Sequence, residues 1–212
     1  MNKLYIHYGC GLSAPEQWQN YDASPTLKLQ RLPLIGFVFR KVLKPIFPFN
    51  IKYGDITKGL PNVKENSADG IYCSHVLEHL AYDEMIKAID NTYLMLKPGG
   101  TFRLVMPDLE NLISSYISRK NNNDHEAAIV FMRNTGMGLV KREKGIKAIF
   151  AEVFGNSRHQ WLWDYESTKK VLENAGFRNI RKCKFNDSKD KLFALVENPQ
   201  RFNGALCLEV IK

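Results

Sequence analysis

Short strand-like runs of apolar residues alternate along the chain with segments of helical periodicity, and this alternation limits the fold more than any other feature. Residues 4–8 read as a buried strand, and residues 69–73 read as another. Further along, apolar residues fall at positions 82, 85, 86, 89, 93 and 96, which is helical spacing. Because strands that alternate with helices form a mainly parallel sheet covered on both faces, the pattern predicts an α/β fold.

The same reading predicts the remaining elements. Further short strands are expected at 18–22, just before Asp55, and at 101–106, 177–183 and 205–211. A helix is expected from Asp108, its N-cap, to about Arg119, and another around 168–175, closed by Gly176. Residues 24–49 cannot form one regular helix because interior prolines remove backbone donors. One or two helices are expected within 125–160.

The length of 212 residues predicts a single domain, 1–212, with insertions at about 24–49 and 121–165. A hydrophobic fraction of 44% and a charged fraction of 25% are typical of soluble globular proteins and exclude a disordered chain. The start has no signal-peptide pattern, and the apolar runs are too short to span a bilayer. The scattered cysteines predict reduced, mostly buried thiols and a cytoplasmic location: Cys10, Cys73, Cys183 and Cys207.

The net charge of +8 would attract acidic substrates, anionic lipid head groups or nucleic acid. The chain carries no recognised nucleic-acid-binding motif. Basic and apolar residues are mixed in 24–49, which is consistent with two hypotheses. The segment either forms a lid over a ligand or rests on a membrane surface, which would make the protein peripheral to the inner face of the membrane.

Ligands of such folds bind at the carboxyl ends of the strands, and candidate residues lie at these positions. The turn Tyr8–Gly9–Cys10–Gly11 follows the first strand and begins a match to the GxGxxG/A pattern. Asp22 ends the second strand, where a carboxylate can accept two hydrogen bonds from a ribose diol. After the third strand, Asp55 could accept a hydrogen bond from an adenine amino group while Ile56 packs against the base.

The order of the motifs GCG, a strand-two Asp, YGDI, SHVLEHL and LKPGG resembles class I S-adenosylmethionine-dependent methyltransferases, most closely the methyltransferase type 11 group. The resemblance runs from about Leu4 to Asp108 and resumes from Trp163 to Phe177. It implies a Rossmann-like fold with a mostly parallel seven-stranded sheet, helices on both faces and an antiparallel last strand. It also implies S-adenosyl-L-methionine as the cofactor and S-adenosyl-L-homocysteine as the product.

The resemblance further implies roles for individual residues. Gly9 and Gly11 would lie under the methionine part of the cofactor, Asp22 would hold the ribose, and Asp55 and Ile56 would contact adenine. Two residues after the fourth strand would line the floor near the sulfonium: Ser74 and His75. The chain departs from the family pattern at His7, where an acidic residue is usual, and in lacking the third glycine of the turn. The short gap between Gly11 and Asp22 also predicts a vestigial first helix.

A hydroxyl or protonated amine acceptor would need a general base with a pKa near neutrality, whereas no metal is expected. The candidate bases are His75, His79, His159 and Asp108. His159 belongs to a polar and aromatic cluster that could line an acceptor pocket. The acceptor could be a sugar, a small metabolite, a lipid-linked intermediate or a protein. The sequence leaves the oligomeric state open.

Three alternatives remain open. His75, Glu78 and His79 match the HxxEH motif of inverted zinc peptidases, which would require them to lie on a helix. A nicotinamide-dependent oxidoreductase would place its ribose-binding acid about 20 residues after the glycines, later than Asp22. The third alternative is a non-catalytic module with a methyltransferase-like fold, which the departures at His7 and at the third glycine favour.

Overall fold

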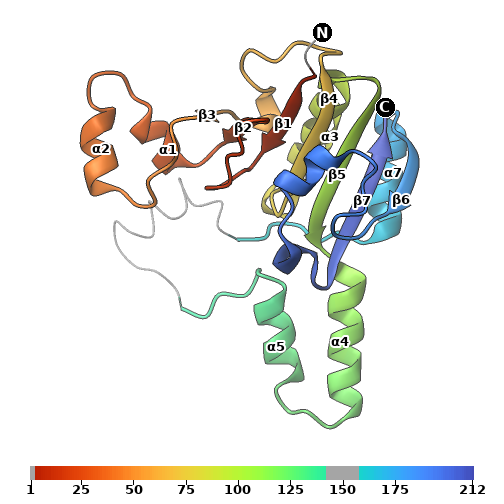
Figure 1. Cartoon of the computed structure of the whole chain (residues 1–212). Coiled ribbons are helices and arrows are strands. Elements are labelled where there is room, and N and C mark those ends of the chain that lie inside the picture. The colour runs from red at the N-terminus through yellow and green to blue at the C-terminus, as the bar shows by residue number, and fades with distance from the viewer. Residues whose placement is uncertain (1–2, 142–157) are drawn as a thin grey trace.

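A seven-stranded sheet lies at the centre of the computed structural model, which describes residues 3–141 and 158–212 (Figure 1). The strand order is β3-β2-β1-β4-β5-β7-β6 in this described part of the chain. The strands are β1 (Tyr5–Tyr8), β2 (Gln19–Asp22), β3 (Ile51–Tyr53), β4 (Ala68–Ser74), β5 (Leu96–Pro107), β6 (Arg178–Lys182) and β7 (Ala205–Ile211).

Strand direction separates β7 from the rest of the sheet. Neighbouring strands from β3 to β5 pair in parallel, whereas β7 pairs antiparallel with both β5 and β6. The carboxyl ends of the parallel strands therefore meet at one edge of the sheet, which is the edge where ligands bind in such folds. The predicted fold class, with its antiparallel last strand, is confirmed.

The helices described are α1 (Pro25–Gln30), α2 (Gly36–Val42), α3 (Tyr82–Met95), α4 (Leu109–Asn121), α5 (Ala127–Asn134) and α7 (Tyr165–Ala175). Four short 3-10 helices are also described: η1 (Ile56–Lys58), η2 (Leu77–His79), η3 (Lys191–Leu195) and η4 (Pro199–Phe202).

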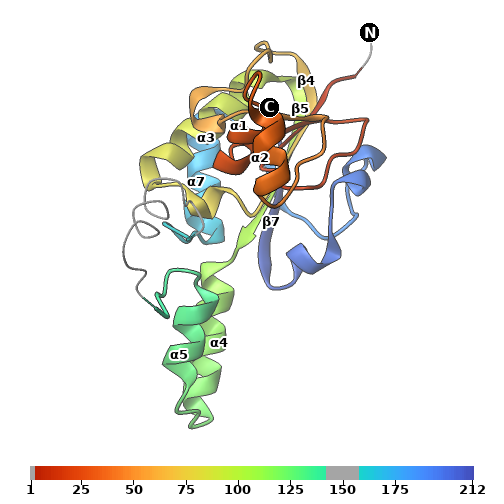
Figure 2. The ribbon, with the colours of Figure 1, turned by 90° about the vertical axis from the view of Figure 1, so that its left-hand side faces the viewer.

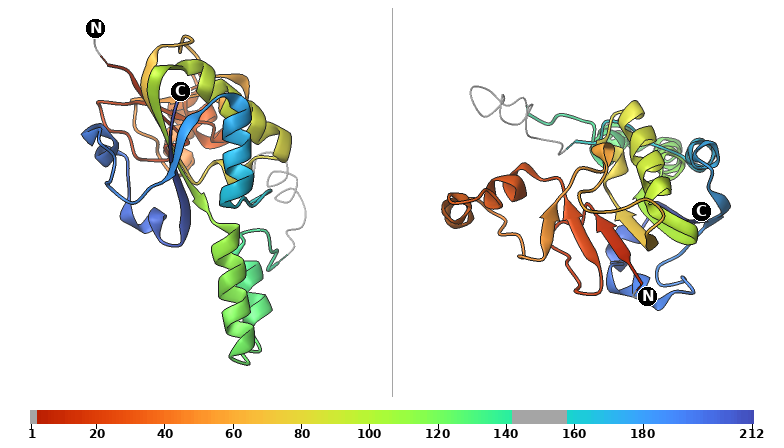
Figure 3. Two further views of the ribbon diagram at one scale, coloured as in Figure 1. Left: turned by 90° about the vertical axis from the view of Figure 1, so that its right-hand side faces the viewer. Right: turned by 90° about the horizontal axis from the view of Figure 1, so that it is seen from above.

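The two faces of the sheet are covered by different kinds of element (Figure 3). Successive residues of a strand point to opposite faces, so Ile6 and Tyr8 belong to one core cluster and Tyr5 to another. The first cluster packs against α3 and α7, through side chains such as Ile89 and Leu172. The second packs against the segment that holds η3 and η4, so one face is covered by α-helices and the other mainly by 3-10 helices.

Capping residues in the sequence determine where the predicted helices begin and end. The Asp108 side chain accepts a hydrogen bond from Glu110 N at 3.0 Å and so caps α4, as expected. Asp164 caps α7 in the same way through Ser167 N at 2.8 Å. The helix ends at Ala175, and the next residue, Gly176, caps it with a left-handed φ of 104°. Helix α3 ends at Met95, one residue earlier than expected.

Residues 24–49 form two short helices, α1 and α2, as the prolines require (Figure 2). They lie beyond the β3 edge of the sheet. One small core cluster ties this segment to the turn after β1: Cys10, Leu27, Phe47 and Ile51. Between β1 and β2 the described residues contain turns in place of a helix, so the first helix is reduced as predicted.

Helices α4 and α5 form a hairpin that projects from the carboxyl edge of the sheet (Figure 1). The Tyr116 and Phe131 rings lie 5.5 Å apart between the two helices. None of the α4 residues, all of which are described, is buried. The expected acceptor-side cap at 121–165 includes α5, whereas its residues 142–157 lie outside the described part of the chain.

All four cysteines are buried and free, as expected from their spacing. None of the described helices combines the length and the apolar character needed to cross a membrane.

Candidate functional site

A cavity of about 470 Å³ opens at the carboxyl ends of β1 to β4. This volume is within the range of small-molecule sites. Seven of the predicted cofactor residues line it: Tyr8, Gly9, Gly11, Asp22, Asp55, Ile56 and His75. The structure therefore brings predicted residues from four different strand ends together in one cavity.

The glycine turn after β1 approaches the segment after β4 too closely for any side chain. Gly9 has a φ of 63°, in the left-handed region. A Cβ atom there would lie 2.0 Å from Cγ2 of Val76. Glycine is therefore required at this position by both backbone conformation and space.

The Asp22 carboxylate is held by the backbone on both of its oxygens. Oδ2 accepts a 2.9 Å hydrogen bond from Gly11 N, and Oδ1 accepts a 2.8 Å bond from Ser24 N. Burial raises the pKa of Asp22, and these two hydrogen bonds oppose the rise without cancelling it. Each oxygen keeps a lone pair for a ligand, so the carboxylate can bind two hydroxyl groups of a diol.

Asp55 presents a second carboxylate to the cavity from the end of β3. Its Oδ1 accepts hydrogen bonds from Thr57 N at 3.0 Å and Thr57 Oγ1 at 2.7 Å, and Lys58 Nζ lies 3.1 Å from Oδ2. Burial acts to raise the pKa of Asp55, but the Thr57 and Lys58 contacts outweigh it and lower the pKa. Ile56 is buried next to Asp55 and offers an apolar surface to a flat ring.

His75 follows β4 with a φ of 52° and lines the same cavity. Its Nε2 lies 3.0 Å from the Arg201 carbonyl oxygen, and its Nδ1 lies 3.1 Å from Oε1 of Glu78. Burial acts to lower the pKa of His75, but the Glu78 carboxylate and the Arg201 carbonyl outweigh it and raise the pKa.

Two of the other candidate bases meet beside the cavity. His79 lines it, and the His159 ring lies 4.9 Å from the His79 ring, centroid to centroid. His159 Nδ1 is 2.7 Å from the Thr135 carbonyl oxygen, so the end of α5 reaches this part of the site. His159 comes from the polar and aromatic cluster before α7, about 80 residues further along the chain.

Three predicted residues lie elsewhere. Cys10 and Ser74 line a second cavity on the other side of the glycine turn, together with His7 and Arg201. Burial lowers the pKa of His7 to about 3, so this side chain is neutral and does not replace the acidic residue usual in the family. The side chain of Asp108 caps α4, and its backbone bridges to Trp163, so this carboxylate serves the fold.

The structure also adds residues that the sequence reasoning did not single out for the cofactor site. Tyr53, Thr57, Val76 and Glu84 line the cavity. In the sequence, Glu78 belongs to the HxxEH motif of inverted zinc peptidases. That motif does not form, because residues 77–79 make a 3-10 helix and His75 precedes it with a positive φ.

Comparisons with known proteins concern the fold and the family of the chain. A family model described as a methyltransferase domain matches residues 16–182. No curated protein matches the chain. A SAM-dependent methyltransferase from Archaeoglobus fulgidus is 16% identical with a TM-score of 0.50, over 99% of this chain and 86% of that one. Another SAM-dependent methyltransferase, from Thermotoga maritima, is 15% identical with a TM-score of 0.50, and the match covers 99% of this chain and 82% of that one. These two structures share the fold, and the family match covers most of the chain. The chain therefore belongs to the methyltransferase-domain family.

Proposed function

We propose that this chain transfers a methyl group from S-adenosylmethionine to a hydroxyl or amine of an acceptor that binds beside His75 and His79. The observation that carries the proposal is the pair of carboxylates at neighbouring strand ends, Asp22 and Asp55, which line one cavity with the glycine turn. This arrangement suits a nucleoside with a ribose diol and an adenine amino group.

S-adenosylmethionine, when bound, would supply an activated methyl group, carried on a positively charged sulfur, to the acceptor's lone pair. The chain's own residues would bind and orient the two partners. Asp22 would hold the ribose, Asp55 and Ile56 would hold the adenine, and the Gly9 turn would let the backbone approach. Orientation and exclusion of water account for most of what such a reaction requires.

His79 and His159 remain the candidate bases for an acceptor that must lose a proton, whereas both ring nitrogens of His75 already face oxygen acceptors. His79 lines the cavity after β4 and the His159 ring lies beside it, whereas Asp55 lies after β3, at the other end of the row of parallel strands β3-β2-β1-β4. The acceptor would therefore enter from the side of η2 and of the end of α5. We propose a sugar or small metabolite, free or lipid-linked, as the acceptor.

Isothermal titration with S-adenosylmethionine and S-adenosylhomocysteine tests this function. Wild type and Asp83→Ala, which removes an exposed carboxylate of α3 paired with Lys87, should bind both ligands alike. Asp22→Ala should bind at least about 10-fold more weakly, since a hydrogen bond to a charged group contributes about 1.5–3 kcal/mol. Failure of wild type to bind either ligand would refute the proposal. Binding without transfer to any acceptor would favour the non-catalytic alternative.

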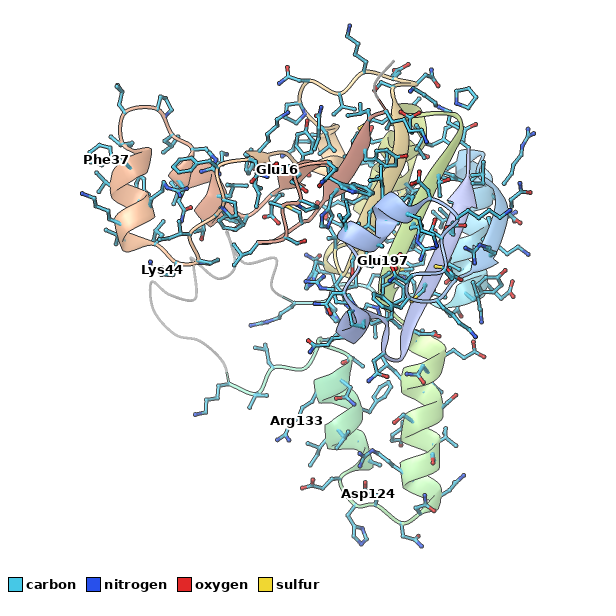
Figure 4. All side chains as sticks on the ribbon, viewed as in Figure 1. Glu16, Phe37, Lys44, Asp124, Arg133 and Glu197 are labelled. Atoms are coloured by element: carbon cyan, nitrogen blue, oxygen red, sulfur yellow. The ribbon has the colours of Figure 1, made fainter. Side chains whose placement is uncertain are left out.

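A second proposal concerns the α1–α2 segment, which we infer to contact an anionic membrane surface and so to bring the site to a lipid-linked acceptor. Leu34 is 91% exposed, Val42 72% and Phe49 81%. Lys41 and Lys44 are exposed among them, and Figure 4 shows Phe37 and Lys44 at the outer edge of the molecule. Exposed apolar and basic side chains together are typical of interfacial segments. The alternative, a lid over the ligand, is supported only at the start of the segment, where Ser24 and Pro25 line the cavity.

Vesicle sedimentation separates the two roles. The wild type should sediment with phosphatidylserine vesicles and much less with phosphatidylcholine vesicles. The double variant Lys41→Glu/Lys44→Glu and the single variant Phe37→Ser should lose binding. The double variant Lys64→Glu/Lys189→Glu makes the same change in net charge at exposed positions elsewhere, and it should keep binding. If both double variants lose vesicle binding equally, binding depends on overall net charge and not on this segment, which contradicts the proposal. Failure of the wild type to bind vesicles would also refute it.

A further inference from the structure

Three potential metal-ligating side chains gather beside the cavity. Glu78, His79 and His159 each offer one ligand atom, and these atoms all lie within 4.8 Å of one another. Gln160 N donates a 2.7 Å hydrogen bond to the Glu78 carbonyl oxygen and so holds the segment of His159 against η2. The cluster is thus built by tertiary contact and not by local sequence.

Glu78 is the least accessible member of the cluster. Its side chain is 1% exposed, and within residues 3–141 and 158–212 neither carboxylate oxygen has a partner in hydrogen-bond geometry. Oε1 lies 3.8 Å from Nε2 of His159 and 3.1 Å from Nδ1 of His75. A buried carboxylate is costly unless it is paired or bound to a metal. His75 pairs with Oε1 from one side, whereas Oε2 has no such partner among the described residues, so a bound cation would complete the pairing of Glu78.

The two imidazoles are oriented so that each keeps a lone pair for a ligand. Nδ1 of His79 lies 3.1 Å from the Arg158 carbonyl oxygen, and Nδ1 of His159 lies 2.7 Å from the Thr135 carbonyl oxygen. Because a carbonyl oxygen only accepts, each Nδ1 carries the proton and each Nε2 keeps its lone pair. Histidines that bind metals have this same arrangement, with the other ring nitrogen donating to a carbonyl or carboxylate.

The chain also leaves no freedom for the His159 ring to move toward α5. Gly136 has a φ of 68°, and a Cβ atom there would lie 2.5 Å from Nδ1 of His159. Glycine at this position therefore allows the ring to pack directly on the backbone that accepts its hydrogen bond.

We propose that Glu78, His79 and His159 bind one divalent transition-metal cation at the edge of the cavity. Metal bonds of about 2.0–2.2 Å place tetrahedral ligand atoms roughly 3.4 Å apart, so the 3.8 Å separation of Glu78 Oε1 and His159 Nε2 requires only a small closure. Two imidazoles and one carboxylate suit zinc, iron or manganese better than calcium or magnesium. Three protein ligands also leave coordination positions open.

The role of the cation follows from its place, and this part of the inference rests on the proposed function. His79 lines the cavity, so the open positions would face the acceptor. A hydroxyl oxygen bound there would have its pKa lowered, lose its proton to solvent and keep the electron pair that attacks the methyl carbon. A hydroxyl acceptor is therefore favoured over an amine.

Metal binding can be tested without turnover. The full chain, freed of metal with a chelator, is dialysed against Zn²⁺ or Mn²⁺ alone, and the metal retained is measured by elemental analysis. Wild type should retain about one equivalent and melt at a higher temperature with metal. Glu78→Gln and His159→Ala should weaken binding by more than ~100-fold, because even outer partners of a metal ligand contribute about 10–100-fold. His125→Ala removes an exposed histidine outside the cluster and should bind as wild type does.

The outcomes are distinct. Failure of the wild type to retain either metal would overturn the proposal, and so would unchanged binding by His159→Ala. If Glu78→Gln does not fold, as judged by circular dichroism, His79→Ala carries the same test. Titration with S-adenosylhomocysteine is run on the same samples. Metal retention without cofactor binding would support the metal site and refute the proposed function. Cofactor binding without metal retention would support the proposed function and refute the metal site.

Discussion

The backbone N–H of Gly11 donates a 2.9 Å hydrogen bond to Oδ2 of Asp22, and this bond joins the turn after β1 to the end of β2. Ser24 N holds the other oxygen at 2.8 Å. The carboxylate is therefore fixed in orientation before any ligand arrives. Such preorganisation lowers the entropic cost of binding, because the side chain does not have to be ordered by the ligand.

Gly9→Ala should destabilise the protein by about 2–4 kcal/mol, because the left-handed backbone costs about 1–3 kcal/mol and the contact with Val76 adds a similar overpacking cost. Gly11→Ala is the matched control, since it has a similar φ of 56° and no atom within 4 Å of the added Cβ. It should cost roughly 1–2 kcal/mol. Urea unfolding measures both. Val76→Ala should restore part of the loss in Gly9→Ala, and equal costs for the two glycines would contradict the steric argument.

Binding of S-adenosylhomocysteine should weaken as the pH falls. The weakening should begin at a higher pH than it would if Asp22 had the ordinary pKa of an aspartate. The pKa of Asp22 is raised, so this carboxylate is the first of the two to take up a proton as the pH falls, and a protonated Asp22 loses an acceptor for the ribose. The pKa of Asp55 is lowered, so Asp55 takes up a proton at a lower pH than Asp22 does. Titration calorimetry across acidic pH should show an acidic limb that Asp22→Asn removes. Asp55→Asn should keep the limb, and the reverse pattern would show that the two roles are exchanged.

Arg103→Met should destabilise the fold by about 3–5 kcal/mol, because it leaves buried carboxylates without their guanidinium. The Arg103 side chain is 1% exposed and contacts Glu197, whose side chain is 0% exposed, as well as Asp187 and Glu209. Arg181→Met is the control, because Arg181 contacts Asp187 and Glu209 too but is 41% exposed. It should cost no more than about 1 kcal/mol. Urea unfolding that gave equal losses would show that burial does not decide the difference.

Asp187 should contribute stability that disappears in acid. Its pKa is about 2 instead of 3.8, because hydrogen bonds from Arg181, Lys184 N and Arg103 outweigh the opposing effect of burial. A lowered carboxyl pKa stabilises the native state above the unfolded value, and this contribution is lost as the pH falls from 3.8 toward 2. Asp187→Asn should be less stable by about 1 kcal/mol at pH 7, because solvent weakens the ion pairs of a partly exposed carboxylate, and its stability should depend less on pH between about pH 4 and 2. Parallel curves for the two proteins in thermal unfolding would contradict this assignment.

The order of elements and the strand-end residues that line the cavity were readable from the sequence. Periodicity separates strands from helices locally, and glycine or aspartate after an apolar run marks the end of a strand. Once a parallel sheet is inferred, the carboxyl ends of its strands must meet at one edge, which is why Asp22 and Asp55 could be placed together. The prolines of 24–49 likewise determined that this segment breaks into short helices.

Tertiary structure alone decided which side chains complete the site. Glu78 and His159 are about 80 residues apart, and the pairing of Gln160 with the η2 backbone brings them together. Arg201 is another such residue, because its guanidinium donates to the distant Ser74 carbonyl oxygen at 2.7 Å. Packing also places Ser74 and Cys10 in the second cavity, on the other side of the glycine turn from the cavity that Asp22 and Asp55 line. A local pattern specifies backbone conformation and which face of an element is apolar. Contacts between distant segments depend on how those elements pack, and packing is a property of the whole folded chain.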